Sequence, residues 1–189
     1  HKKDKSNLTS FGFGDNNNFI KAISPPTSPE KAAKKGRGET SPLMYLDEFA
    51  FISFIQELYN SASPAFSKAS ENAEKQGMPF SRVISTTPAY LDHPSGAFCY
   101  QIIKGSYKFR LDLLDMDIKV VRDLIAGDYS GSNMMYIEYS YTELGRDEIW
   151  FKKQCAGLMH DMTAIKMELL LEWLNASQTG VFSEEQIDN

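Results

Sequence analysis

The chain has 189 residues, of which 42% are hydrophobic and 12% aromatic, enough apolar material for one domain with a core. Its formal net charge of −5 gives no overall attraction for nucleic acid, so DNA binding would need a local basic patch or a surface outside these residues. No apolar run reaches the roughly 20 residues that a membrane-spanning helix needs, and no signal peptide opens the chain, so we expect neither membrane insertion nor secretion.

The first 42 residues predict little regular structure. Residues 1–18 are polar and favour loop, whereas 19–23 alternate weakly and predict a short strand. The stretch 24–42 combines several prolines with a basic run. It predicts a long loop with one helical turn over 30–34.

A strand, two helices and a second strand are predicted next. The apolar run Leu43–Leu46 stops on two carboxylates, a pattern typical of a buried parallel strand. Apolar residues at helical spacing then predict a helix, and they are Phe51, Ile52, Ile55, Leu58 and Tyr59. Pro64 suits the first turn of a further helix that runs to Lys75, and Ser81–Thr86 predicts the next strand.

The second half of the chain continues the alternation of strands and helices. Helices are predicted over 97–103 and 118–126, a strand over 134–141, and two helices over 147–159 and 163–175. The stretch 107–116 is ambiguous between strand and helix. Alternating strands and helices favour an α/β fold.

The two carboxylates after the first strand are the strongest candidates for chemistry. In open α/β sheets, ligands bind at the carboxyl ends of the strands. There Asp47 could hold Mg²⁺ through water, and Glu48 could polarise the water that attacks a phosphate. Alternatively, both acids are solvated groups at the N-terminus of a helix, where negative charge is favourable.

Three hydroxyl side chains end the second strand, and an isolated arginine precedes the first. Ser85, Thr86 and Thr87 could contact a γ-phosphate or its attacking water, or they could simply close the strand in a turn. Arg37 lies between two glycines and could stabilise transition-state charge on a phosphate, although the local sequence favours a solvated basic loop. No segment carries the Gly-Lys-Ser/Thr pattern of a Walker A motif at the required spacing.

Other titratable residues do not predict a metal centre. His93 and His160 lack cysteine or histidine partners at metal-ligand spacing, so zinc is not expected. Asp112, Asp115 and Asp117 match no nuclease motif and favour a solvated acidic face.

In chain order, these motifs resemble the large terminase subunit of tailed bacteriophages, the motor that packs DNA into procapsids. The resemblance covers about residues 19–185, and its most specific part is Asp47-Glu48 followed by Phe-Ala-Phe-Ile. Its other parts are Gly36-Arg37-Gly38, Ile84–Pro88, Tyr141–Trp150, the acidic helix of Glu168 and Glu172, and Phe182-Ser183.

The resemblance implies an α/β fold of the P-loop NTPase class, in its RecA-like form with an additional strand and a catalytic glutamate. The sheet would be flanked by helices and incomplete, with a small helical subdomain attached. Residues 1–126 would be a portion of the ATPase core without its Walker A motif. Residues 127–189 would be the end of that core and a small linker subdomain. The Walker A segment and the nuclease domain of the family would lie outside these residues.

The family also implies roles for the candidate residues. Asp47 would be the Walker B acid on the metal side, and Glu48 the catalytic base. Ser85, Thr86 and Thr87 would form the coupling motif that links hydrolysis to movement of DNA. Arg37 stands eleven residues before Glu48, the spacing of an arginine finger that acts on the ATP of a neighbouring subunit. ATP and Mg²⁺ are the implied cofactors, and this chain alone is expected to be inactive.

The implied partners are double-stranded viral DNA, the portal protein and the small terminase subunit. The full-length protein would form a homo-oligomeric ring at the procapsid portal in the host cytoplasm. Two alternatives remain open: a fragment of a superfamily 2 helicase or translocase, and a non-catalytic interaction module derived from an ATPase. Without a P-loop strand beside it, the strand Ser81–Thr86 is expected to be an exposed sheet edge.

Overall fold

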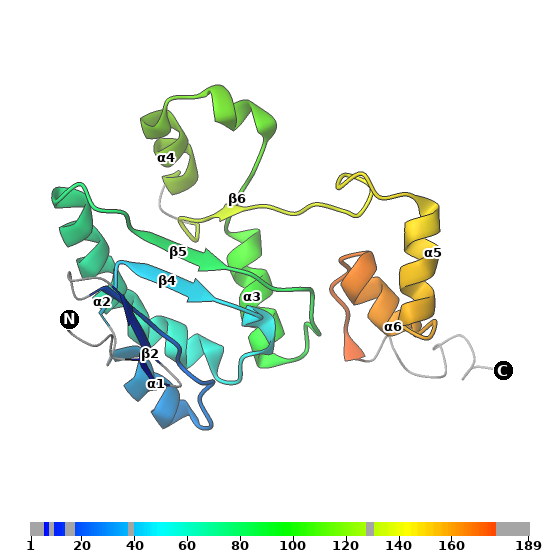
Figure 1. The fold of residues 1–189 in the computed structure, drawn as a ribbon, viewed down its shortest axis with the longest axis horizontal. Coiled ribbons are helices and arrows are strands. Elements are labelled where there is room, and N and C mark those ends of the chain that lie inside the picture. The colour runs from blue at the N-terminus through cyan, green and yellow to red at the C-terminus, as the bar shows by residue number, and fades with distance from the viewer. Residues whose placement is uncertain (1–5, 8–9, 14–17, 38–39, 128–130, 177–189) are drawn as a thin grey trace.

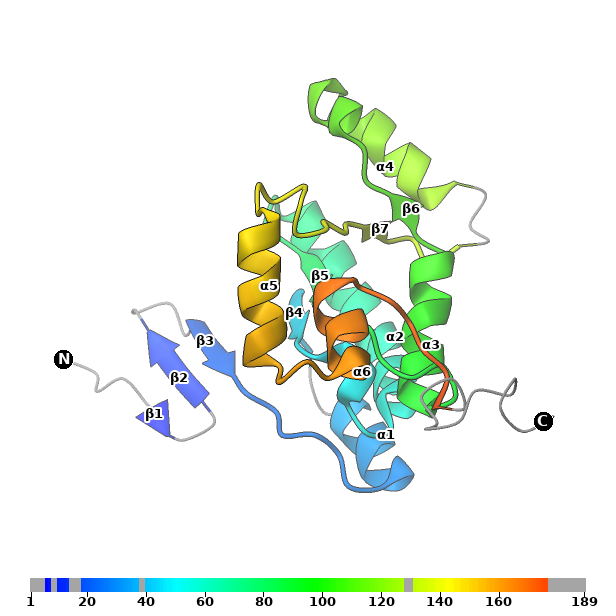
Figure 2. The ribbon, with the colours of Figure 1, turned by 90° about the vertical axis from the view of Figure 1, so that its right-hand side faces the viewer.

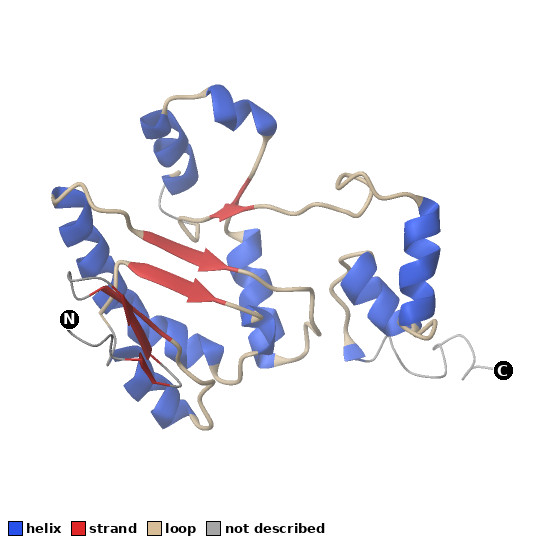
Figure 3. Cartoon of the chain, viewed as in Figure 1, coloured by secondary structure: helices blue, strands red, loops and turns tan. Residues whose placement is uncertain are grey.

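We describe the protein from a computed structural model, in which residues 6–7, 10–13, 18–37, 40–127 and 131–176 are placed. The chain is a mixed α/β protein with a small sheet of short parallel strands flanked by helices (Figures 1 and 3). This confirms the predicted α/β class at the level of a partial sheet.

A small antiparallel sheet lies near the N-terminus, where the sequence predicted mostly loop. It contains β1 (Ser6–Asn7), β2 (Ser10–Phe13) and β3 (Asn18–Lys21), in the order β1-β2-β3. The prediction was wrong for the described part of 1–18 because backbone pairing between β2 and β3 outweighs the low strand propensity of Gly and Asn. Figure 2 shows this sheet standing apart from the strands that carry the candidate site.

Two helices, one before and one after the first candidate strand in the sequence, pack against each other. Helix α1 (Pro29–Arg37) has nine residues where one turn was expected, and it packs against α2 (Ile55–Lys75). The two helices predicted between residues 51 and 75 are one, and it continues through Pro64. A proline inside a helix removes one hydrogen bond. Burial of Ile55, Ala62 and Ala73 against the rest of the protein outweighs this loss.

The start of α2 also differs from the prediction. Phe54 adopts a left-handed conformation (φ 54°) immediately before the helix, and Phe51 belongs to a separate 3-10 turn, η1 (Phe49–Phe51). Phe51 is half exposed, so it is not part of the buried stripe of α2. The helix therefore begins four residues later than the apolar spacing indicated, because Phe49 and Ala50 are drawn into the core instead.

The central sheet consists of β4 (Leu43–Leu46) and β5 (Ser81–Ile84), which pair in parallel with Leu43 opposite Ser81 and Leu46 opposite Ile84. Both predicted strands are present, although β5 ends two residues earlier than expected. Among the described residues, neither strand has a further neighbour. The outward side chains Leu43, Tyr45 and Val83 are 53%, 63% and 50% exposed. The prediction that β4 is a buried strand is therefore wrong for this face.

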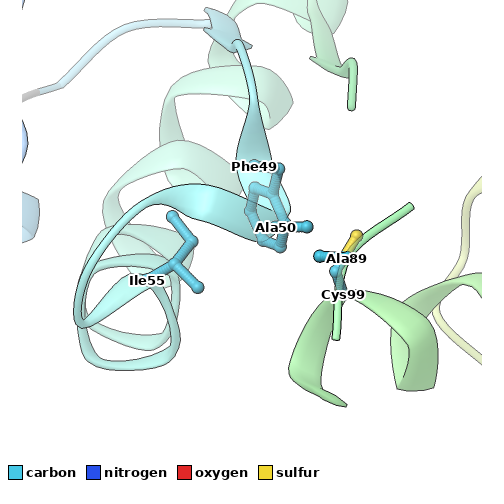
Figure 4. Close-up of a cluster of buried hydrophobic side chains, with 5 residues drawn as sticks. All are labelled: Phe49, Ala50, Ile55, Ala89 and Cys99. Atoms are coloured by element: carbon cyan, nitrogen blue, oxygen red, sulfur yellow. The ribbon is translucent and has the colours of Figure 1, made fainter. Parts of the chain in front are cut away.

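The hydrophobic core lies behind this sheet and includes the residues that follow Glu48. Its fully enclosed members are Phe49, Ala50, Ile55, Ala89 and Cys99 (Figure 4). The ring of Phe49 lies 6.0 Å from that of Phe98 and 5.9 Å from that of Tyr59. Burial raises the pKa of the Cys99 thiol to about 12. The core therefore anchors the chain immediately after the two candidate carboxylates.

After the core helix α3 (Pro94–Lys104), the chain makes an excursion that projects from the body in both views (Figures 1 and 2). It contains β6 (Tyr107–Lys108), η2 (Leu111–Asp115) and α4 (Ile118–Ala126), and it returns at β7 (Met135–Tyr136), which pairs with β6 in parallel. The strand predicted over 134–141 is thus only two residues long. Helix α4 has the predicted bounds and is followed by Gly127 at φ 52°.

The last described elements form a separate helical pair (Figure 1). Helix α5 (Glu148–Gly157) is followed by the short α6 (Met162–Ala164) and the π-helical turn η3 (Ile165–Leu169). The helix predicted over 163–175 ends early because Leu171 takes a left-handed conformation (φ 57°). The chain then turns back, and Leu174 pairs in parallel with Tyr90. Within the described residues, no helix combines the length and apolarity needed to cross a bilayer.

Candidate functional site at the ends of two parallel strands

Asp47 is the first residue after β4, and Ser85 is the first residue after β5. Because the strands are parallel and paired in register, their carboxyl ends lie side by side. The backbone continues this pairing: Ser85 donates its N–H to the Leu46 carbonyl at 3.0 Å, and Phe49 donates to the Ser85 carbonyl at 3.1 Å. The fold therefore brings together the candidate metal residue and the first of the three candidate coupling residues.

The Asp47 carboxylate is held by two hydroxyl groups. Ser85 Oγ donates to Asp47 Oδ1 at 2.6 Å, and the Tyr45 hydroxyl donates to the same oxygen at 3.0 Å. The two hydroxyl oxygens are 2.8 Å apart. The sequence interpretation did not include Tyr45. A signal existed, because side chains two apart in a strand point to the same face, and Tyr45 stands two residues before Asp47.

These hydrogen bonds stabilise the ionised form of Asp47. The bond from Ser85 is the largest cause that lowers the pKa of this carboxyl below its ordinary value, and the bond from Tyr45 is the second. The lowered pKa extends the pH range in which Asp47 is negatively charged to more acidic conditions. Both hydroxyl donors use Oδ1, so neither of them occupies Oδ2.

Replacing Ser85 by alanine is expected to raise the pKa of Asp47 towards its ordinary value, because the variant loses the stronger of the two hydroxyl donors. Carbon-detected NMR titration of the Asp47 carboxyl measures this directly. The lowered pKa in the folded state stabilises the fold above the unfolded-state pKa, and this contribution is lost as pH falls through the folded pKa. The difference in melting temperature between wild type and variant should therefore shrink on acidification.

Ser81 at the other end of β5 is exposed and provides the matched control. Ser81→Ala should leave the pKa of Asp47 unchanged. An unchanged Asp47 pKa in Ser85→Ala would show that the hydrogen bond between the strand ends does not form in solution.

Glu48 differs from Asp47 in both conformation and environment. Its backbone is left-handed, with φ 50° and ψ 45°. For a residue with a side chain, such a conformation costs about 1–3 kcal/mol and is frequent at functional sites. Burial of Phe49 and its hydrogen bond to Ser85 hold the chain in this turn. The Glu48 side chain is exposed and has no hydrogen bond to the described residues, so it is free to face a ligand.

The other two candidate coupling residues contribute differently. Thr86 Oγ1 accepts a hydrogen bond from the Ala50 N–H at 3.2 Å and donates to the Thr87 carbonyl at 2.9 Å. Thr86 therefore ties the end of β5 to the turn that carries Glu48. Thr87 participates through its backbone carbonyl in this arrangement. Ser85 and Thr86 together connect the second strand to both sides of the carboxylate pair.

Arg37 is not brought to this site within the chain. It is the last residue of α1, and the neighbouring Gly36 lies against Leu58 and Ala62 of α2. Its side chain is exposed, and no ion pair joins it to Asp47 or Glu48 in the part of the chain described. Gly36 lies inside α1, where the sequence predicted loop, and its lack of a side chain allows close packing on α2.

Two aspartates of the excursion between α3 and β7 are engaged in local structural contacts. Asp112 forms a salt bridge with Arg110, and Asp117 accepts a hydrogen bond from the Lys119 N–H at the start of α4. Asp147 likewise caps α5, where its side chain accepts a hydrogen bond from the Trp150 N–H. Over residues 6–176, the described parts contain no cluster of three or more His, Cys, Asp or Glu side chains arranged to hold a metal ion.

Two hollows occur elsewhere on the surface. One, of about 410 Å³, lies between Tyr141, Phe151 and His160, and the other, of about 280 Å³, lies between the starts of α2 and α3. Neither includes Asp47 or Glu48, which stand on open surface beside the uncovered face of the sheet.

We compared the chain with protein-family models, with curated proteins and with solved structures, and none of them matches it.

Proposed function

We propose that this chain is the Walker B and coupling portion of a DNA-packaging ATPase of the large terminase type, and that a phosphate-binding loop outside these residues completes its ATP site. Asp47 would bind Mg²⁺ through water, and Glu48 would act as the general base on the attacking water. Ser85 and Thr86 would sense the state of the site. The full-length protein would couple ATP hydrolysis to translocation of double-stranded DNA.

The hydrogen bond between Asp47 and Ser85 is the observation that carries this proposal. It joins an acidic strand end to a hydroxyl strand end across a parallel pair, which is where ligands bind in open α/β sheets. Mg²⁺ in nucleotide sites takes oxygen ligands from one or two carboxylates and from substrate phosphates. Asp47 fits that requirement, since its pKa is lowered, it is exposed, and both hydroxyl donors use Oδ1 and not Oδ2.

The two carboxylates differ in hydrogen bonding and backbone conformation, which also supports separate roles for them. Asp47 is held in place by two side chains, as expected of a group that positions a metal. Glu48 has no side-chain hydrogen bond to the described residues and lies on a strained turn that Phe49 anchors in the core. A general base needs a carboxylate that can reach water rather than one already engaged in hydrogen bonds.

The uncovered surfaces of β4 and β5 support the proposal that the site is completed by another segment. Parallel sheets are normally covered on both faces. Here one face of the pair exposes Leu43, Tyr45 and Val83, and both strand edges lack a described neighbour. A strand that carries the phosphate-binding loop, added beside β5 with its covering helix, would bury this face and place phosphates near Asp47.

Arg37 fits this proposal only as a residue that acts between subunits. It lies on a basic helix with Lys31, Lys34 and Lys35, its side chain is exposed, and no described ion pair joins it to Asp47 or Glu48. An exposed arginine of this kind could reach the γ-phosphate bound by a neighbouring subunit in a ring. Its spacing from Glu48 remains the main argument for that role.

The deciding experiment measures ATP binding and hydrolysis by the full-length polypeptide that contains these residues, with and without double-stranded DNA, beside the 189-residue chain alone. We expect the full-length polypeptide to bind and hydrolyse ATP with Mg²⁺, and the chain alone to do neither, because it carries no Walker A motif. A full-length polypeptide that neither binds nor hydrolyses ATP would contradict the proposal.

A further inference from the structure

Tyr45 contacts both residues of the central hydrogen bond. Its hydroxyl oxygen lies 3.0 Å from Asp47 Oδ1 and 2.8 Å from Ser85 Oγ, while Ser85 Oγ lies 2.6 Å from Asp47 Oδ1. Three oxygens therefore form a closed triangle at the ends of β4 and β5. Tyr45 reaches this position because it lies on the outward face of β4, two residues before Asp47, which follows the strand.

The triangle has more contacts than protons. The carboxylate of Asp47 only accepts hydrogen bonds, whereas each of the two hydroxyls carries one proton. Two protons cannot fill three contacts at once, so one contact is always without a hydrogen bond. Ser85 can donate to Asp47, or it can rotate and donate to the Tyr45 oxygen.

The second arrangement leaves every group with a partner. When Ser85 donates to Tyr45, the Tyr45 proton still points at Asp47 Oδ1, so the carboxylate keeps one hydrogen bond in each state. Without the Tyr45 hydroxyl, rotation of Ser85 would leave Asp47 with no side-chain donor among those described and would leave the Ser85 proton without its alternative acceptor.

We propose that Tyr45 is a positioning residue that keeps the Asp47 carboxylate oriented while Ser85 exchanges its hydrogen bond between Asp47 and Tyr45. This inference rests on the proposed function, since it concerns the hydrogen bond between Ser85, the proposed coupling residue, and Asp47, the proposed metal-side acid. Tyr45 acts through Asp47 and does not touch the reacting phosphate. The exchange moves no heavy atom between residues and needs only rotation of the Ser85 hydroxyl group.

The test is a double-mutant cycle in the full-length polypeptide with Tyr45→Phe, Ser85→Ala and the pair combined. The measured quantities are the Mg²⁺ concentration for half-maximal ATP hydrolysis and the kcat at saturating Mg²⁺. Each single variant should raise the half-maximal Mg²⁺ concentration about fivefold, because one hydrogen bond to the carboxylate remains. The double variant should raise it by more than the product, above about 25-fold. For Tyr45→Phe alone, kcat at saturating Mg²⁺ should stay within about twofold.

Phenylalanine retains the ring, so a purely structural role of Tyr45 in the sheet would leave the Mg²⁺ dependence of Tyr45→Phe unchanged. Tyr139→Phe removes an exposed hydroxyl on the segment after β7 and is the matched control, for which no change is expected. Two outcomes would overturn this inference but not the proposed function. One is a double variant whose half-maximal Mg²⁺ concentration rises only by the product of the two single effects, and the other is a Tyr45→Phe protein with wild-type Mg²⁺ dependence. Absence of ATP hydrolysis in the unmodified polypeptide would overturn the proposed function and this inference with it.

Discussion

Glu48→Gln in the full-length polypeptide is expected to lower ATP turnover by about 10²–10⁴-fold while ATP binding is retained. The amide cannot accept a proton from the attacking water, but it has nearly the same size as the carboxylate, and the left-handed turn at residue 48 depends on the burial of Phe49 instead. Steady-state hydrolysis and equilibrium binding of a fluorescent ATP analogue measure the two quantities separately.

Glu71→Gln, on the exposed side of α2, is the matched control and should leave both quantities unchanged. Loss of ATP binding in Glu48→Gln would reassign Glu48 to a structural role. Retained turnover would place the general base elsewhere.

The same variant tests whether Arg37 acts between subunits. Mixing an Arg37→Ala polypeptide with a Glu48→Gln polypeptide should restore part of the hydrolysis that each lacks, because some subunit interfaces would then contain both an intact arginine and an intact glutamate. Hydrolysis is measured over a series of mixing ratios. Absence of rescue at every ratio would remove Arg37 from the proposed site.

Gly36→Ala is expected to destabilise the fold by about 3 kcal/mol. A methyl group on Gly36 would lie 2.7 Å from the Leu58 carbonyl oxygen and 2.8 Å from the Ala62 nitrogen. Both are backbone atoms of α2, so α1 has to move away from the helix on which it packs. The change is measured by urea unfolding of the chain, followed by circular dichroism.

Gly157→Ala is the control for replacing a helical glycine by alanine where no close contact results. Gly157 is the last residue of α5, and a methyl group there would meet nothing within 4 Å. Replacing a helical glycine with alanine usually raises stability slightly. Equal effects of the two substitutions would show that α1 does not pack against α2 as described.

Some features of the fold could be predicted from local sequence because they depend on neighbouring residues. The run Leu43–Leu46 and the β-branched centre of β5 predicted the two strands that form the parallel pair. The N-cap Asp117 and the following Gly127 enclose a helix of the predicted length. Pro64 misled the prediction because helix burial, which local spacing does not report, outweighs the lost hydrogen bond.

The arrangement of the candidate site required the tertiary structure. Asp47 and Ser85 are 38 residues apart, and their hydrogen bond depends on the register of β4 with β5, which non-local packing sets. The left-handed turn at Glu48 likewise follows from burial of Phe49 and not from any preference of glutamate. The sequence by itself determined which residues end the two strands. Tertiary structure decided that Asp47, Ser85 and Tyr45 share one hydrogen-bonded triangle, because only pairing of the strands brings their ends together.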